Sequence, residues 1–102
     1  SRDMCYIDNV VSANILAANA DCTFKGRAYN VACGDSTSNN QILEYLKQQF
    51  GNKVKIRHTP ERSGDVKHTQ ADLFEIKKDI GYEPKVRFWE GLDRTIAWWN
   101  IK

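Results

Sequence analysis

Residues 28–57 read AYNVACGDSTSNNQILEYLKQQFGNKVKIR, and this stretch decides the fold class. Residues 28–32 have the composition of a short buried strand that stops at Gly34. Ser38 and Gln41 form a capping-box pattern at the start of a helix that ends before Gly51. Residues 53–57 then alternate polar and apolar, as a half-exposed strand does. Because strand, helix and strand in this order normally form a right-handed parallel unit, we expect a small α/β fold.

Three more helices are expected around this strand-helix-strand unit. Apolar residues recur at helical spacing over about residues 8–19, after Asp8 or Asn9 as a cap. Asp72 starts a short helix that Gly81 ends, and a last helix begins at about Glu90. These elements predict about four helices in one domain, residues 1–102, because a chain of this length builds a single core.

The composition excludes several functional classes. Hydrophobic residues make up 41% of the chain and charged residues 27%, as in ordinary folded proteins. Fifteen Lys and Arg against thirteen Asp and Glu give no electrostatic attraction toward nucleic acid or a membrane, and no apolar run could span a bilayer. Cys5, Cys22 and Cys33 are too few for a disulfide scaffold, so we expect free thiols in the cytoplasm.

The chain holds no self-sufficient active site by sequence. It lacks the glycine-rich dinucleotide fingerprint, the phosphate-binding loop and the zinc-protease motif. His58 and His68 have no Cys or carboxylate at metal-ligand spacing. We therefore predict no catalytic residue, no cofactor-binding residue and no metal ligand in these 102 residues.

Two arginines stand beside carboxylates and form the candidate binding site. Arg2 and Arg62 could clamp a diphosphate from two sides, because guanidinium groups match phosphate oxygens bidentately. A neighbouring carboxylate could accept ribose hydroxyls. The alternative is that Arg2 pairs with Asp3 or Asp8, and Arg62 with Asp65, in surface ion pairs worth at most about 1 kcal/mol each.

Four motifs, taken in their order, resemble one known family. They are Arg-Asp-Met-Cys-Tyr-Ile-Asp-Asn-Val-Val from residue 2, Tyr-Asn-Val-Ala-Cys-Gly from residue 29, Arg-x-Gly-Asp-Val-x-His from residue 62, and Gly-Tyr-x-Pro followed by Glu-Gly-Leu in residues 81–92. Together they resemble the C-terminal subdomain of the extended short-chain dehydrogenase/reductases, the NAD-dependent epimerase/dehydratase family. Within it, the chain is most similar to UDP-N-acetylglucosamine 4-epimerases of polysaccharide biosynthesis.

The resemblance implies a role for each candidate residue. Arg2 and Arg62 match family arginines that contact the diphosphate, and Asp65 matches the carboxylate that contacts the ribose. Thr69 matches a position that borders the sugar pocket, where a small side chain favours an N-acetylhexosamine. Selection of this kind is steric and discriminates by only a few kcal/mol.

The resemblance also implies parts that these residues do not contain. Family members carry NAD on an N-terminal Rossmann domain and use a Tyr-x-x-x-Lys pair for proton transfer, whereas Tyr29, Tyr45 and Tyr82 are not followed by Lys at that spacing. We therefore expect a substrate-binding fragment that lacks its Rossmann domain and is inactive alone. Its expected partners are a UDP-sugar and the missing domain, in a parent enzyme that is a homodimer.

Two alternatives stay open at this point. The same part could belong to a nucleotide-sugar dehydratase, decarboxylase or reductase, since the distinguishing groups lie elsewhere in such enzymes. It could also be a free-standing nucleotide-sugar-binding module. A severed domain should expose an apolar patch, with Phe88, Trp98 and Trp99 as candidates, whereas an independent module should not.

Overall fold

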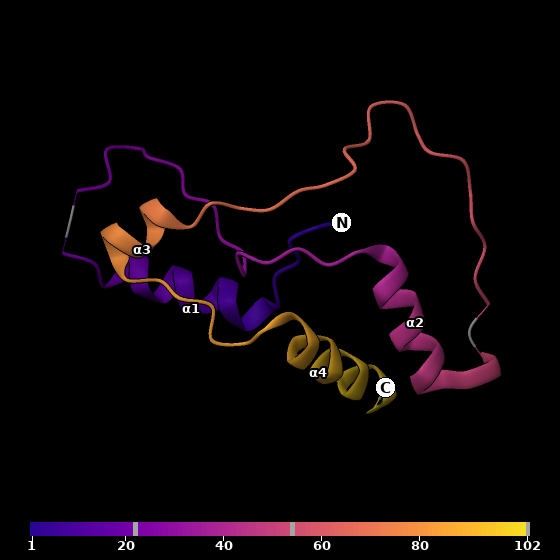
Figure 1. Cartoon of the computed structure of the whole chain (residues 1–102). Helices are drawn as coiled ribbons and strands as arrows, with labels where there is room; N and C mark the ends of the chain where they lie inside the picture. Colours follow the sequence, from indigo (N-terminus) through magenta and orange to yellow (C-terminus); the bar gives the residue numbers. More distant parts are fainter. Residues whose placement is uncertain (22, 54, 102) are drawn as a thin grey trace.

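A computed structural model describes residues 1–21, 23–53 and 55–101 of the chain (Figure 1). Within these ranges four α-helices follow one another, which agrees with the number predicted from the sequence. The short 3₁₀ helix η1, Gly51–Lys53, continues directly from the second of them. The α-helices are α1, Ile7–Ala18; α2, Asn39–Phe50; α3, Phe74–Ile80; and α4, Phe88–Ile101.

Both ends of α2 and the C-terminal end of α3 follow the local sequence signals. The Ser38 hydroxyl accepts a hydrogen bond from the Gln41 backbone N–H at 3.1 Å, and the Gln41 side chain accepts from the Ser38 N–H at 3.0 Å. This is the predicted capping box. Gly81 ends α3 in the left-handed conformation, with φ at 71°. Asp72 accepts from the Phe74 N–H at 3.0 Å, but α3 begins at Phe74 after Leu73 as the N-cap, so the helix starts later than the cap predicted at Asp72.

The expected parallel strand-helix-strand unit is wrong. In the described part of the chain there is no β-strand, and the one isolated bridge is antiparallel, between Arg2 and Thr37. Residues 28–32 carry no strand pairing, and neither do residues 55–57; Val54, in the second predicted strand, lies outside the described residues. An extended segment becomes a strand only when another backbone pairs with it. The segment that follows η1 leaves α2 on the side away from α1 and α3 and returns to α3 only after a long arc (Figure 1), and residues 55–57 do not pair with residues 28–32.

A small core joins α1, α3 and the extended segments between them. Its buried members are Ala13, Ala32, Leu73, Ile76 and Tyr82. Tyr82 is fully buried, and its hydroxyl donates to the Ala32 carbonyl oxygen at 2.7 Å. None of the α2 residues is buried. This helix lies apart from the core (Figure 1) and meets α4 through Tyr45, whose ring centroid is 5.1 Å from that of Trp89.

Asn9 ties α1 to the chain between α3 and α4. The sequence suggested it as a helix cap, but its side chain is buried inside the first turn of α1. Its Nδ2 donates to the Val86 carbonyl oxygen at 2.8 Å. Its Oδ1 accepts from the N–H groups of Lys85 at 3.0 Å and Val86 at 3.1 Å. One amide therefore satisfies three backbone groups of a distant segment, because Asn supplies both donors and acceptors.

The molecule is open for its size. Its radius of gyration is 16.6 Å, whereas a compact chain of this length has about 13 Å. Its accessible surface is 7904 Å², against about 5,900 Å² for a globular protein of 11.7 kDa. Within the described residues, no helix is both long enough and apolar enough to cross a membrane.

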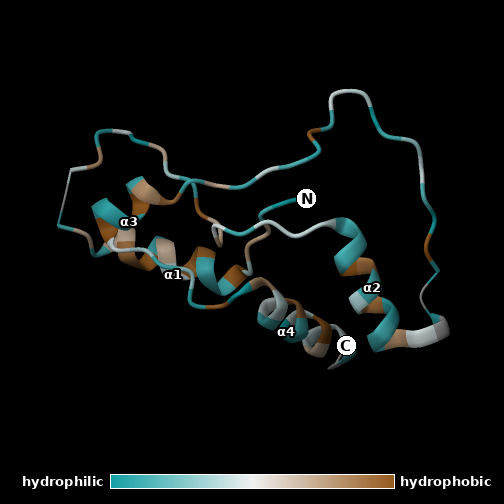
Figure 2. Cartoon of the chain, viewed as in Figure 1, coloured by the Kyte–Doolittle hydropathy of each residue, from teal (hydrophilic) through white to brown (hydrophobic). Residues whose placement is uncertain are grey.

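Several large apolar side chains are exposed on this open structure. Ile7, Val11 and Ile15 stand one turn apart on α1, at the helical spacing noted in the sequence, and all three are exposed. Of the three aromatic residues predicted to be exposed, Trp98 and Trp99 on α4 are 53% and 66% exposed, whereas Phe88 is only partly exposed. The long segment between η1 and α3 is mostly hydrophilic, and the helices carry most of the apolar residues (Figure 2).

Candidate functional site

The first residues of the chain lie between two segments that are distant in sequence. Arg2 and Thr37 exchange backbone hydrogen bonds of 2.9 and 2.8 Å. On the other side, the Thr69 N–H donates to the Ser1 carbonyl oxygen at 3.0 Å, and the Ser1 nitrogen donates to the Lys67 carbonyl oxygen at 2.5 Å. Arg2 is therefore held between the approach to α2 and the end of the long hydrophilic segment.

A cavity of about 250 Å³ opens at this junction. We call it the Arg2 pocket, and it is lined by Ser1, Arg2, Asn39, Glu61, Asp65, Val66 and Lys67. Asn39 is the first residue of α2, so the helix N-terminus borders the pocket. The amides of a helix N-terminus carry partial positive charge and favour anions. Sequence reasoning missed Asn39, although its place directly after the predicted cap Ser38 already put it at the helix start.

The structure brings together some of the predicted site residues. Arg2 and Asp65 both line the pocket. Arg62 and Thr69 are not among the lining residues. The Arg62 side chain is 85% exposed, and its Nε lies 3.2 Å from Asp65 Oδ2. Thr69 is held by its backbone, and its carbonyl oxygen also accepts from the Ser36 hydroxyl at 3.0 Å.

The ion-pair alternative holds for one of the two arginines. Arg62 pairs with Asp65, as that alternative expected. Arg2 instead donates from Nη1 to the Ser1 carbonyl oxygen at 2.9 Å. The carboxylates suggested for it have other partners: Asp3 accepts backbone N–H groups, and Asp8 lies 3.5 Å from Arg94.

The charged side chains around the pocket are balanced, and their ion pairs are exposed and weak. Arg2 and Lys67 bring two cations, while Glu61 and Asp65 bring two carboxylates. Lys67 Nζ lies 4.0 Å from Glu61 Oε1, and both side chains are highly exposed. Exposed pairs of this kind contribute at most about 1 kcal/mol. An incoming phosphate could therefore replace a carboxylate partner at small cost.

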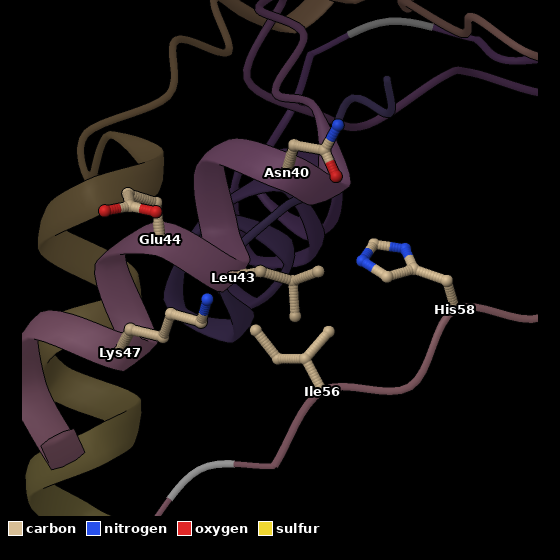
Figure 3. Close-up of a pocket in the computed structure, with 6 residues that line it drawn as sticks. All are labelled: Asn40, Leu43, Glu44, Lys47, Ile56 and His58. Atoms are coloured by element: carbon tan, nitrogen blue, oxygen red, sulfur yellow. The ribbon is translucent and has the colours of Figure 1, made fainter. Parts of the chain in front are cut away.

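A second cavity, of about 330 Å³, lies between α2 and the segment that follows η1 (Figure 3). Leu43 and Ile56 point toward each other in it, and His58 lies beside them. None of the predicted substrate-binding residues lines this cavity. His68 is elsewhere, with its Nδ1 2.5 Å from the Ser1 hydroxyl. Within the described ranges, no three His, Cys, Asp or Glu side chains are grouped so as to hold a metal ion.

The resolved pKa shifts lie away from the Arg2 pocket. Burial raises the pKa of the Cys33 thiol, and a thiol with a raised pKa is a poor nucleophile at neutral pH. The Tyr29 hydroxyl donates to Asp79 at 2.5 Å, which raises the pKa of Tyr29 and lowers that of Asp79. Cys5 and Cys33 are free thiols, as predicted; Cys22 lies outside the described residues.

Comparison with known proteins gives nucleotide-sugar 4-epimerases and also dTDP-glucose 4,6-dehydratases, such as that of Streptomyces niveus, with 28% identity over 74% of this chain and 23% of that protein. No family model matches the chain. It is similar to the UDP-glucuronate 4-epimerase of Thermodesulfobacterium geofontis, with 34% identity over 96% of this chain and 30% of that protein. It is also similar to the UDP-glucose 4-epimerase of Mycolicibacterium smegmatis, with 26% identity over 100% of this chain and 32% of that protein.

A solved structure gives the same result. The crystal structure of the UDP-glucose 4-epimerase of Thermotoga maritima with UDP-glucose matches 96% of this chain at 34% identity and a TM-score of 0.82. The match covers 31% of that protein. The chain thus spans 23–32% of the length of these relatives.

Proposed function

We propose that this chain, a portion of a protein of the NAD-dependent UDP-sugar epimerase and dehydratase family, is the nucleotide-sugar-binding domain of a UDP-sugar 4-epimerase. In this proposal the Arg2 pocket receives the nucleotide diphosphate. The observation that carries the proposal is the convergence of Arg2, Asp65 and Lys67 on one cavity at the N-terminus of α2. A guanidinium, an ammonium and helix amides together suit a diphosphate.

The other site residues have roles consistent with this arrangement. Asp65 lines the pocket and has the carboxylate chemistry to accept ribose hydroxyls. Arg62 would exchange its exposed pair with Asp65 for a phosphate oxygen, because a bidentate arginine–phosphate contact is stronger than a surface ion pair. Binding would then free the Asp65 carboxylate for the ribose.

The pocket suits a part of such a ligand rather than all of it. Its volume of about 250 Å³ is below the range of about 300–1,000 Å³ that is usual for complete small-molecule sites. The exposed apolar face of α1 and the open shape support the same reading. We infer that the remaining wall of the cleft comes from parts of the parent protein outside these 102 residues.

NAD, the cofactor of this family, does not fit the residues present. A dinucleotide site needs a strand, a glycine-rich turn and a helix whose N-terminus meets the pyrophosphate. In the described ranges none of the four α-helices begins after such a turn or follows a strand. In this proposal the chain contributes to the substrate site and not to the cofactor site.

The sugar remains a hypothesis that depends on Thr69. A small side chain near the sugar would leave room for an N-acetyl group. The relatives described above are named for UDP-glucuronate, UDP-glucose and dTDP-glucose, so their names give this preference no support. Comparing UDP-glucose with UDP-N-acetylglucosamine in the parent enzyme, before and after Thr69→Tyr, addresses it directly.

The test of the proposal is a titration of the chain with UDP, followed by ¹⁵N NMR and calorimetry. We expect millimolar affinity, with amide shifts at Arg2, Asp65 and Lys67. Arg2→Ala should weaken binding about tenfold or more, as expected for hydrogen bonds to a charged ligand. Arg27→Ala is the matched control, because Arg27 pairs with Asp79 at the distant α3 end.

Three outcomes would contradict the proposal. They are the absence of UDP binding up to the solubility limit, shifts confined to residues outside the Arg2 pocket, and equal weakening by Arg2→Ala and Arg27→Ala. Micromolar binding that Arg62→Ala abolishes would instead favour a free-standing nucleotide-sugar-binding module.

A further inference from the structure

The Asp3 carboxylate gathers backbone groups from two distant parts of the chain. Oδ1 accepts from the Cys33 N–H at 3.1 Å. Oδ2 accepts from the N–H groups of Gly34 at 2.9 Å and Ala71 at 3.1 Å. Hydrogen bonds from N–H groups to a carboxylate are stronger than neutral ones. One side chain next to Arg2 therefore joins two segments that have no helix in common.

The backbone groups that Asp3 binds belong to the two segments that continue into the lining of the Arg2 pocket. Gly34 leads into Thr37, which pairs with Arg2, and then into α2. Ala71 follows the hydrophilic segment that carries Asp65 and Lys67. In extended backbone, neighbouring side chains point to opposite sides. With Asp3 held on the inner side by three N–H groups, Arg2 is directed to the opposite side, where it lines the pocket.

We propose that Asp3 is a positioning residue for nucleotide-diphosphate binding: its carboxylate holds the 33–34 and 71 backbones so that Arg2 faces Asp65 and Lys67. The inference rests on the proposed function of the Arg2 pocket. Asp3 does not line that pocket and acts through its neighbour. This role differs from the surface ion pair with Arg2 that the sequence allowed.

The first part of the test measures the hydrogen bonds that the backbone N–H groups donate to Asp3. In the wild-type chain, amide hydrogen exchange followed by NMR should show the Gly34 and Ala71 N–H groups protected. Asp3→Asn should accelerate their exchange, because it removes the charge and replaces one acceptor oxygen with a donor. Asp8→Asn is the matched control, since Asp8 is an exposed carboxylate on α1 that pairs with Arg94. Fast exchange of both amides in the wild-type chain would overturn the inference, whether or not Asp3→Asn folds.

The second part of the test measures how Asp3 affects ligand binding through the position of Arg2. Asp3→Asn should weaken UDP binding about tenfold, an effect equal to about 1.4 kcal/mol, and leave uridine binding nearly unchanged. In an Arg2→Ala background the same change should have little further effect, because its influence passes through Arg2. A folded Asp3→Asn chain with wild-type UDP affinity, or equal losses for UDP and uridine, would overturn the inference. If wild-type chain fails to bind UDP, the proposed function fails, while the exchange rates still decide whether Asp3 anchors the two segments.

Discussion

Replacing Asn9 by alanine should remove a large part of the stability of this chain, because one buried amide serves three backbone groups. Asn9 is 1% exposed, and its partners are the N–H and carbonyl oxygen of Val86 and the N–H of Lys85. Val86 is also buried, so water does not readily replace the lost partners. Each buried polar group left unsatisfied costs about 1–3 kcal/mol.

These costs give a destabilisation of about 3–5 kcal/mol for Asn9→Ala, from two stranded Val86 groups and the small cavity left by the amide. A domain of this size has about 5–15 kcal/mol in total. Asn9→Asp should also destabilise the chain, because a second oxygen would then face the Val86 carbonyl oxygen in place of a donor. Asn9 is thus expected to matter more than any exposed polar residue of α1.

The assay is urea unfolding at 25 °C, followed by far-UV circular dichroism, with Asn14→Ala as the matched control. Asn14 is on the same helix, is exposed and donates only to the Val10 carbonyl oxygen one turn earlier, at 2.9 Å. Its replacement should change the free energy of unfolding by no more than about 0.5 kcal/mol. A difference below about 1 kcal/mol between the two variants would refute the burial argument.

Two further predictions concern packing and pH. A Cβ on Gly91 would stand 2.8 Å from Tyr6 Cβ, so Gly91→Ala should destabilise the chain by about 1–2 kcal/mol despite a better helix propensity; a more stable variant in the same urea assay would show that Tyr6 can move aside. Burial raises the pKa of both Tyr82 and Cys33, so the folded state favours their neutral forms. Stability should hold below about pH 8 and fall as the pH rises past the unfolded pKa values of about 8.5 and 10. Tyr82→Phe should flatten the upper part of that fall, and an unchanged pH profile would exclude Tyr82 as its source.

The elements that the sequence predicted correctly depend on contacts within a few residues. The capping box of α2 spans four residues, from Ser38 to Gln41, and forms as expected. Gly51 and Gly81 end their helices because their positive φ angles suit glycine better than other residues. All the residues that form these helix caps lie close together in the sequence, so the caps can be predicted without knowing the tertiary structure.

The wrong predictions concern residues whose partners lie far away. Residues 28–32 have the composition of a strand, but a strand also needs a paired backbone, which the described chain does not place beside them. Helical spacing showed that Val11 and Ile15 share a face of α1 but could not tell whether anything covers it. Asn9 has the residue type of a cap, yet distant backbone groups at Lys85 and Val86 engage its side chain.

For the candidate site, the sequence by itself determined the chemistry: two arginines and a carboxylate in motifs typical of nucleotide-sugar binding. Only the tertiary structure decided the arrangement. It placed Arg2 and Asp65 on one pocket, paired Arg62 with Asp65, and added Asn39 from the start of α2. Residue type sets what a side chain can bind, whereas the long-range backbone bonds from Arg2 to Thr37, and from Ser1 to residues 67 and 69, set which side chains meet.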